Sequence, residues 1–281
     1  MKIGLVLEGG GMRGLYSTGV LDCFLDHDIM TDYVIGVSAG ACHGVSYLSK
    51  QRGRSFRINT AYLKDKRYLS IRNFLKTKSL FGMDFLFDEI PHKLDIFDYE
   101  TFLNSPCEYK LAVTDVKTGK PIYFDKTHLN HDSTILKASC SIPMFANIVE
   151  IDGYNLVDGG VSDSIPIEYA IKQGCDKNIV ILTRDKTYRK SKVKFSSFVK
   201  RKYKKYPKLI ESIENRHLNY NKSLDLVKYL EEKGDAFVIR PKSPVKVSQI
   251  EKDVDKLTKL YNDGYNDAKE SYEKIMEFIN K

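Results

Sequence analysis

A serine framed by glycines is the first feature of this sequence that could carry out chemistry. Ser38 is the centre of the pentapeptide Gly36-Val37-Ser38-Ala39-Gly40, which follows an apolar run and precedes a helix-forming run. In a G-x-S-x-G pattern the serine lies on a sharp strand-to-helix turn with Oγ exposed, and the glycines remove Cβ atoms that would clash there. The pattern and its setting predict a nucleophilic serine, and the structural alternative is an ordinary turn between a strand and a helix.

A nucleophilic serine needs a base, but none of the histidines has a suitable position. In the order serine, acid, histidine, the histidine follows a late strand. The only late histidine, His217, lies in a stretch of helical pattern. His43 lies on the helix after Ser38, roughly 140° around its axis from the serine, which disfavours a direct hydrogen bond. We expect surface or packing positions for all six: His27, His43, His92, His128, His131 and His217.

An aspartate offers an alternative base. Asp158 ends the apolar run of "YNLVDGG" and is followed by Gly159 and Gly160. Because the carboxyl ends of parallel strands meet at one edge of a sheet, Asp158 can lie beside Ser38 although 120 residues separate them. The structural alternative for an isolated Asp-Gly-Gly is a turn closed by the aspartate side chain.

A glycine-rich loop, "EGGGMRG" at residues 8–14, precedes the first expected helix. It matches the dinucleotide fingerprint G-x-G-x-x-G, which requires an acidic residue about 20 residues further on, at the end of the second strand. Here that strand ends at Ser38, and the nearest acid, Asp32, precedes it. The loop is therefore better suited to present backbone N–H groups to an oxyanion than to bind a cofactor.

The elements around these motifs predict an α/β protein. The runs "KIGLVLE" and "DYVIGV" are continuously apolar, as strands buried on both faces are, and a helical pattern follows each. Strand pairs are expected within 108–125 and 147–158, and another buried strand at 178–184. Residues 54–105 are expected to form helices and loops, and they could cover the site. This order is typical of a doubly wound or related sheet.

The character of the chain changes after Arg184, which predicts a catalytic core at 1–185 and a C-terminal extension at 186–281. The extension is expected to contain a basic segment, a helix at 207–234, a strand at 236–241 and a final helix at about 250–279, and to pack on the core. No run of apolar residues reaches the ~20 needed to span a bilayer, and the N-terminus is too short in apolar residues for a secretory leader. Five widely spaced cysteines without a C-x-x-C motif agree with a cytoplasmic protein.

The net charge of +8 is concentrated in one segment. Residues 186–208 contain eleven lysines and arginines and no acid, so the other residues together carry a net charge of −3. Phe195, Phe198, Val199 and Tyr206 would form an apolar stripe on a basic helix, which suits transient attachment to an anionic membrane surface, at the inner face of the membrane. The alternative is a solvated helix packed on the core by that stripe. No nucleic-acid partner is expected, because no nucleic-acid-binding motif accompanies the charge.

"GGGMRG", "GVSAG" and "DGG", in this order and setting, resemble the patatin-like phospholipase family of lipid acyl hydrolases. The resemblance covers about residues 2–184 and implies a three-layer α/β/α sandwich with a mostly parallel central sheet. It implies Ser38 as nucleophile, Asp158 as its partner in a Ser–Asp dyad, and an oxyanion loop formed by Gly9, Gly10, Gly11, Arg13 and Gly14. It implies neither a cofactor nor a metal ion.

The activity expected from this resemblance is hydrolysis of carboxylic esters in phospholipids or related acyl lipids through an acyl-enzyme on Ser38. Backbone N–H groups of Gly10, Gly11 and Ala39 are the expected oxyanion donors. A general carboxylesterase or thioesterase, and a non-catalytic lipid-binding relative, are the alternatives. A dyad predicts activity that persists below about pH 6, unless burial perturbs the pKa of Asp158.

Overall fold

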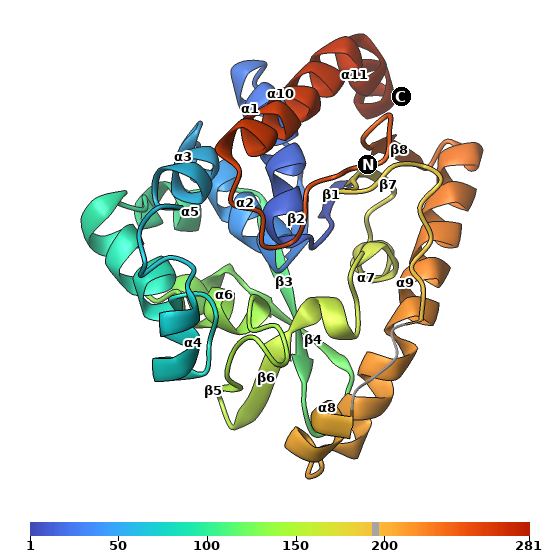
Figure 1. Ribbon diagram of the computed structural model, residues 1–281. Helices are drawn as coiled ribbons and strands as arrows, with labels where there is room; N and C mark the ends of the chain where they lie inside the picture. Colours follow the sequence, from blue (N-terminus) through green and yellow to red (C-terminus); the bar gives the residue numbers. More distant parts are fainter. Residues whose placement is uncertain (193–196) are drawn as a thin grey trace.

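A single mixed sheet forms the centre of the molecule (Figure 1), and the computed structural model describes residues 1–192 and 197–281. The neighbouring strands run in the order β5-β6-β3-β2-β1-β7-β8, and β4 also pairs with β3. The pairs β1–β2, β2–β3, β1–β7 and β7–β8 are parallel, whereas β4, β5 and β6 form antiparallel pairs. The expected mostly parallel sheet is confirmed. The strands are β1 (Ile3–Leu7), β2 (Tyr33–Val37), β3 (Glu108–Asp115), β4 (Pro121–Asp125), β5 (Val149–Ile151), β6 (Tyr154–Asp158), β7 (Lys177–Ile181) and β8 (Ala236–Ile239).

Successive side chains of the parallel strands enter two separate cores, one on each face of the sheet. Leu5 and Leu7 belong to one core, while Val6 between them belongs to the other. The same alternation continues in β7, where Ile179 and Val180 lie on opposite faces. Strands covered on both faces must be apolar throughout, which explains the continuous apolar runs in the sequence.

Helices cover both faces and complete the three layers (Figure 1). The first core packs against α1 (Leu15–Asp26), α2 (Ala39–Leu48) and α10 (Val254–Glu270), and the second against α7 (Ile167–Lys172) and α9 (Pro207–Lys233). The α/β/α sandwich expected from the sequence is thus confirmed.

The C-terminal extension is integrated into this core. Strand β8 pairs with β7 at the end of the sheet, and α10 lies along α1 with close backbone contact. A Cβ on Gly19 would lie 2.0 Å from the carbonyl oxygen of Tyr261, and one on Gly264 would lie 2.1 Å from that of Tyr16. Two glycines therefore allow the helices to approach backbone to backbone. The domain boundary at residue 185 stays a prediction.

Residues 54–105 form short helices beside α2 and α6. These are α3 (Arg54–Ala61), α4 (Ile71–Thr77), the π-helical segment η2 (Phe85–Leu94) and α5 (Tyr99–Asn104). The remaining short elements are η1 (Gly11–Gly14), η3 (Lys126–Leu129), α6 (Thr134–Ser139), η4 (Gly159–Val161), α8 (Ser197–Lys202) and α11 (Tyr272–Asn280). The final helix expected at about 250–279 is two helices, because the chain leaves helical geometry at Ser271.

The basic segment differs from the single amphipathic helix that its pattern predicts. In its described part, Ser197–Lys202 form the short helix α8 and a separate helix, α9, begins at Pro207, while Phe195 lies outside the described residues. Val199 is buried with Tyr203 and Leu209 in a small third core, whereas Phe198 is exposed. The expected apolar stripe is therefore divided, because Val199 packs into the third core while Phe198 faces solvent. None of the helices in the described residues has the length and apolar character required to cross a membrane.

Candidate active site

Ser38 lies at a strained turn between β2 and α2. Its φ of 54° falls in the left-handed region, which a residue with a side chain adopts only at a cost. The flanking glycines let the turn close. A Cβ on Gly36 would lie 2.6 Å from the backbone of Ala41, and one on Gly40 would lie 2.5 Å from the carbonyl oxygen of Leu7. This close backbone packing is the physical reason for glycine on both sides of the serine.

Strand register brings Asp158 to Ser38. Val37, the last residue of β2, pairs with Ala112 of β3, and Asp158, the last residue of β6, pairs with Val113. Strand β4 occupies the opposite edge of β3 along residues 110–114, so β2 and β6 must share the remaining edge. Along that edge β2 is parallel to β3 and β6 is antiparallel to it, so the two strands run toward each other. The prediction that two strand ends meet is correct in outcome, but its premise was wrong: β6 is antiparallel to β3, and the two carboxyl ends meet head to head.

The two side chains are hydrogen-bonded in a buried position. Ser38 Oγ donates to Asp158 Oδ2 at 2.7 Å, and the N–H of Gly160 donates to Asp158 Oδ1 at 2.7 Å. Burial raises the pKa of Asp158 above its ordinary value, while the bond from Ser38, the positive charge of Arg216 and the bond from Gly160 oppose that rise. A carboxylate that accepts a serine proton at this distance can act as a base toward Oγ.

The glycine-rich loop lies beside the serine with two of its N–H groups free. Gly9 N–H donates to Ser164 O, and Met12 N–H donates to Gln249 O. Over the described residues, the N–H groups of Gly10 and Gly11 have no acceptor, and Ala39 N–H begins a helix and lacks an intrahelical one. Gly11 has φ of 56°, and a Cβ there would lie 2.6 Å from Gln249 O. The loop can therefore present N–H donors next to Oγ.

The other motif residues pack around this site. Gly14 lies against His43, and Gly159 lies against the backbone of β3, where a Cβ would be 2.2 Å from Ala112 O. Arg13 does not border either cavity at Ser38; its side chain is buried, and burial and the charge of Arg184 lower its pKa, while the charge of Glu8 raises it. The Arg13 side chain therefore does not border the site, and only a role of its backbone in the oxyanion loop stays a prediction.

Several residues near the dyad carried no signal in the sequence. Ser139 Oγ accepts the N–H of Ser38 at 2.9 Å and donates to Ala112 O at 2.8 Å, which anchors the turn. Tyr220 on α9 donates to the buried Glu8 at 2.6 Å, just before the glycine loop. These partners lie far away in the sequence and belong to no local motif, so only the fold identifies them.

The histidines have no hydrogen bond to Ser38 or Asp158. His43 is buried, burial lowers its pKa to about 4, and neither ring nitrogen has a partner in the described part of the chain. His217 lies on α9 with Nδ1 3.0 Å from the carbonyl oxygen of Glu214. In residues 1–192 and 197–281 there is also no group of three or more His, Cys, Asp or Glu side chains that could hold a metal ion.

Two cavities meet at Ser38. The smaller, of about 140 Å³, is mostly apolar and takes most of its wall from α2, α6 and residues 54–97. Cys42 and Cys140, whose sulfur atoms lie 3.5 Å apart, also border it. The larger, of about 600 Å³, includes Ser38, Asp158 and residues of the C-terminal extension. Residues between Arg54 and Phe97 thus line the apolar cavity, and whether residues 54–105 cover the site as a lid stays a prediction.

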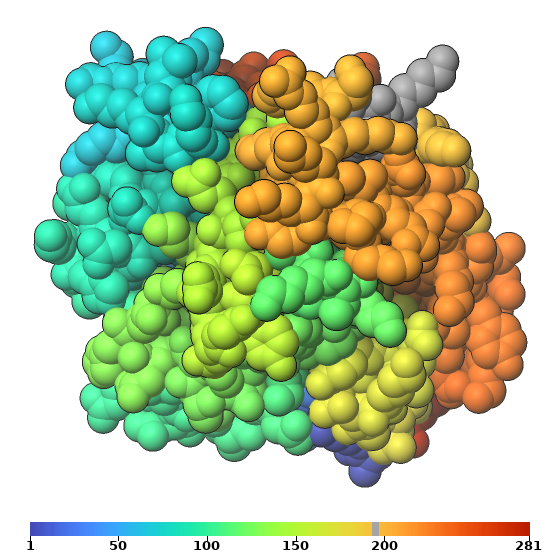
Figure 2. All heavy atoms as spheres, turned by 90° about the horizontal axis from the view of Figure 1, so that it is seen from below, coloured from blue at the N-terminus to red at the C-terminus, as the bar shows by residue number. Residues whose placement is uncertain are grey.

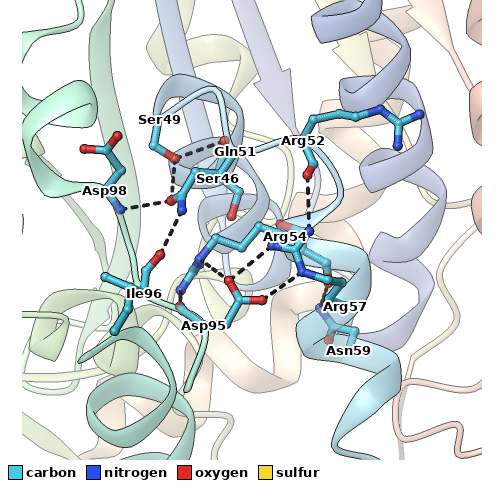
Figure 3. Close-up of polar contacts among 11 residues, drawn as sticks. Ser46, Ser49, Gln51, Arg52, Arg54, Arg57, Asn59, Asp95, Ile96 and Asp98 are labelled. Atoms are coloured by element: carbon cyan, nitrogen blue, oxygen red, sulfur yellow. Dashed lines mark hydrogen bonds and ion pairs between the residues drawn. The ribbon is translucent and has the colours of Figure 1, made fainter. Parts of the chain in front are cut away.

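Polar contacts join parts of that wall to each other and to the end of α2 (Figure 3). Asp95, which follows η2, forms ion pairs with Arg54 at 3.4 Å and with Arg57 at 3.0 Å, both from α3. The Gln51 side chain donates a hydrogen bond to the carbonyl oxygen of Ile96 and accepts one from the N–H of Asp98. These bonds connect the loop after η2 to the ends of α2 and α3.

Comparison with known proteins identifies the family. A family model described as patatin-like phospholipase matches residues 5–171. The chain belongs to the patatin-like phospholipase family. A second model, for a domain of unknown function, matches residues 206–280, which include α9, β8 and α10.

Several known proteins are similar to about two thirds of this chain. The uncharacterized protein YjjU of Escherichia coli is 30% identical over 188 residues, which cover 65% of this chain and 52% of that protein. A lysophospholipase, NTE1, of Scheffersomyces stipitis is 26% identical, and the match covers 64% of this chain and 11% of that protein. An NTE family protein of Mycobacterium bovis is 24% identical over 64% of this chain and 48% of its own length. The matched region thus spans about half or less of these relatives. The solved structure of VipD from Legionella pneumophila aligns with a TM-score of 0.47 and 12% identity, over 96% of this chain and 66% of that one.

Proposed function

We propose that this patatin-like protein is a serine-dependent lipid acyl hydrolase with Ser38 as nucleophile and Asp158 as base. The observation that carries the proposal is the 2.7 Å hydrogen bond from Ser38 Oγ to Asp158, which joins residues 120 positions apart. Ser38 itself lies at a strained turn. The lysophospholipase name of one relative supports the substrate class.

The proposed reaction has two steps. Ser38 Oγ transfers its proton to Asp158 and attacks the ester carbonyl carbon, and the oxyanion accepts hydrogen bonds from the N–H groups of Gly10, Gly11 and Ala39. Collapse breaks the bond to the alcohol, which takes the proton from Asp158 and leaves an acyl-enzyme. Water then attacks the acyl carbon, gives a proton to Asp158, and releases the fatty acid with return of that proton to Ser38.

Active-site labelling combined with lipid hydrolysis tests this proposal. Wild type should react with a fluorophosphonate probe and release fatty acid from a lipid panel followed by mass spectrometry. Ser38→Ala should abolish both, and Asp158→Asn should lower hydrolysis by about 10²–10⁴-fold. Ser243→Ala, at an exposed serine, is the matched control and should behave as wild type. Failure of wild type to react with the probe would favour the non-catalytic alternative, and hydrolysis confined to soluble esters or thioesters would favour the esterase alternative.

We further propose transient contact with an anionic lipid surface around the larger cavity. Phe74 and Phe145 border that cavity and are exposed, and α4 exposes Ile71 and Leu75, at 74% and 69%. Figure 2 shows the segments that contain α4, the loop near residue 145 and α8 on one face of the molecule. The exposed cations of α8 are Lys200, Arg201 and Lys202, of which Lys200 is paired with Glu214 at 2.9 Å, so Arg201 and Lys202 contribute most of the positive charge to this face.

Co-sedimentation with vesicles tests the contact. Binding should be stronger to vesicles containing phosphatidylglycerol than to neutral vesicles and should weaken with salt. Replacing Lys200, Arg201 and Lys202 by Gln should weaken binding by up to about a hundredfold, because each cation contributes roughly 1 kcal/mol near an anionic surface. Equal binding to neutral and anionic vesicles would contradict the electrostatic part of the proposal.

A further inference from the structure

The larger cavity at Ser38 has an apolar side and a cationic side. Its apolar residues come mainly from α4, residues 142–145 and the start of the extension. Its polar residues beyond the dyad come from the extension, and Lys190 and Arg216 are the lysine and the arginine among them. The extension therefore adds positive charge to a cavity whose nucleophile belongs to the core.

This positive charge is not balanced by acids in the cavity. Asp158 is the only carboxylate on the wall as described. Within the described residues, neither Lys190 nor Arg216 has a carboxylate within 4.0 Å. Glu8 lies near enough to favour the charged form of Lys190, but its two oxygens already accept bonds from Thr183 N–H and Tyr220 OH.

Both cations are held in place by the fold. The Lys190 backbone exchanges two hydrogen bonds with the Asn221 side chain, at 2.9 and 3.0 Å, and its Nζ lies 4.5 Å from the centre of the Tyr220 ring. Arg216 Nε donates to the carbonyl oxygen of Gly160, next to the dyad. Burial, and after it the charge of Arg216, lower the pKa of Lys190 to about 8, although the charge of Glu8 opposes this shift.

We propose that Lys190 and Arg216 bind the phosphate group of a glycerophospholipid substrate, so that the C-terminal extension selects phosphate-bearing lipids over neutral acylglycerols. The inference rests on the proposed function. With the ester carbonyl at Ser38, the acyl chain occupies the apolar cavity and the glycerol phosphate the larger one. A guanidinium and an ammonium group are the side chains that recognise phosphate through charge-assisted hydrogen bonds.

The kinetic test compares two substrates that share an acyl chain and differ only in the phosphate. Lys190→Gln should lower kcat/KM for monoacylglycerol phosphate by about ten- to hundredfold and leave that for monoacylglycerol within twofold. Lys190 is chosen because Arg216 also acts on Asp158. The matched control is Lys192→Gln, which removes the same charge from an exposed lysine outside the cavity wall and should change neither value. An equal loss on both substrates, no loss on the phosphate substrate, or the same loss in Lys192→Gln would overturn the assignment.

A binding measurement separates this inference from the proposed function. Calorimetry on the Ser38→Ala protein should show binding of monoacylglycerol phosphate that Lys190→Gln weakens by at least tenfold. If wild type hydrolyses neither substrate but this binding is found, the proposed function fails and the phosphate site stands. If wild type hydrolyses both and Lys190→Gln alters neither binding nor rate, the function stands and the phosphate site fails. If inorganic phosphate binds as tightly as the lipid, the cations form a site for free phosphate and the lipid assignment is overturned.

Discussion

At the scale of single residues, the charge on Asp158 decides how the proposed dyad responds to pH. The carboxylate is buried beside Ser38, and burial raises its pKa, whereas the positive charge of Arg216 lowers it. The base must be deprotonated to accept the serine proton. Activity is therefore present above the raised pKa and is lost as pH falls through it, at a higher pH than an ordinary aspartate would give. The expectation from the sequence, that activity persists below about pH 6 unless burial perturbs the pKa of Asp158, stays a prediction.

Arg216→Gln tests this electrostatic argument. Removing the cation should raise the pKa of Asp158 further, so the acid limb of the kcat/KM profile should move to higher pH. Arg216→Lys should keep the limb near its wild-type position, because the charge is retained. The profiles are measured on monoacylglycerol, which has no phosphate to contact residue 216. An unchanged limb in Arg216→Gln would show that a group other than Asp158 sets the pH dependence.

At the scale of elements, the wall of the apolar cavity depends on how α3 and the loop after η2 are joined within residues 54–97. The contacts run through Asp95, which pairs with a buried Arg54 and an exposed Arg57. The Arg54 side chain is 7% exposed and lies over the Phe97 ring at 5.1 Å, while that of Arg57 is 53% exposed. The two pairs therefore differ in solvent screening although they share one carboxylate.

Asp95→Ala and Arg57→Ala separate the two pairs. Asp95→Ala leaves the Arg54 guanidinium buried without its anion and should lower the free energy of unfolding by about 3 kcal/mol. Arg57→Ala removes only the exposed pair and should cost less than about 1 kcal/mol. Urea unfolding followed by circular dichroism measures both. Equal small losses would mean that water reaches Arg54 and that the wall is held by apolar contacts instead.

At the scale of the whole molecule, the extension and the core share one interior. Strand β8 completes the sheet, α10 covers α1, and Tyr220 on α9 bonds Glu8 beside the glycine loop. The extension also supplies part of the larger cavity. A domain matched separately by a family model is thus, in space, a part of the layer structure that surrounds the site.

Gly264→Ala probes that shared interior. The added Cβ would lie 2.1 Å from the carbonyl oxygen of Tyr16, so α1 and α10 would have to separate. We expect a loss of about 3 kcal/mol in the free energy of unfolding, although alanine is the better helix former by roughly 1 kcal/mol. Asn262→Ala, at an exposed position of the same helix, should stay within about 0.5 kcal/mol of wild type. A stable Gly264→Ala protein would show that the two helices do not pack closely in solution.

Much of the fold and of the site follows from local patterns. Continuous apolar runs predict strands covered on both faces, and the glycines around Ser38 predict a turn too tight for side chains. The pattern at residues 195–206 misled, because an amphipathic stripe does not show whether a neighbouring core will take up its apolar side. Val199 and Tyr203 pack inward while Phe198 stays in solvent.

The sequence by itself determined the buried strands and the tight turn at Ser38, because these depend on local periodicity and local sterics. The three layers and the Ser38–Asp158 pair were expected from the resemblance to the family. Only the tertiary structure decided how Asp158 reaches Ser38, since strand register along β3 makes β2 and β6 meet end to end. It also decided which distant side chains surround the dyad, including Ser139, Arg216 and Lys190. Such contacts depend on how helices and strands pack across the whole chain, and no short stretch of sequence contains that information.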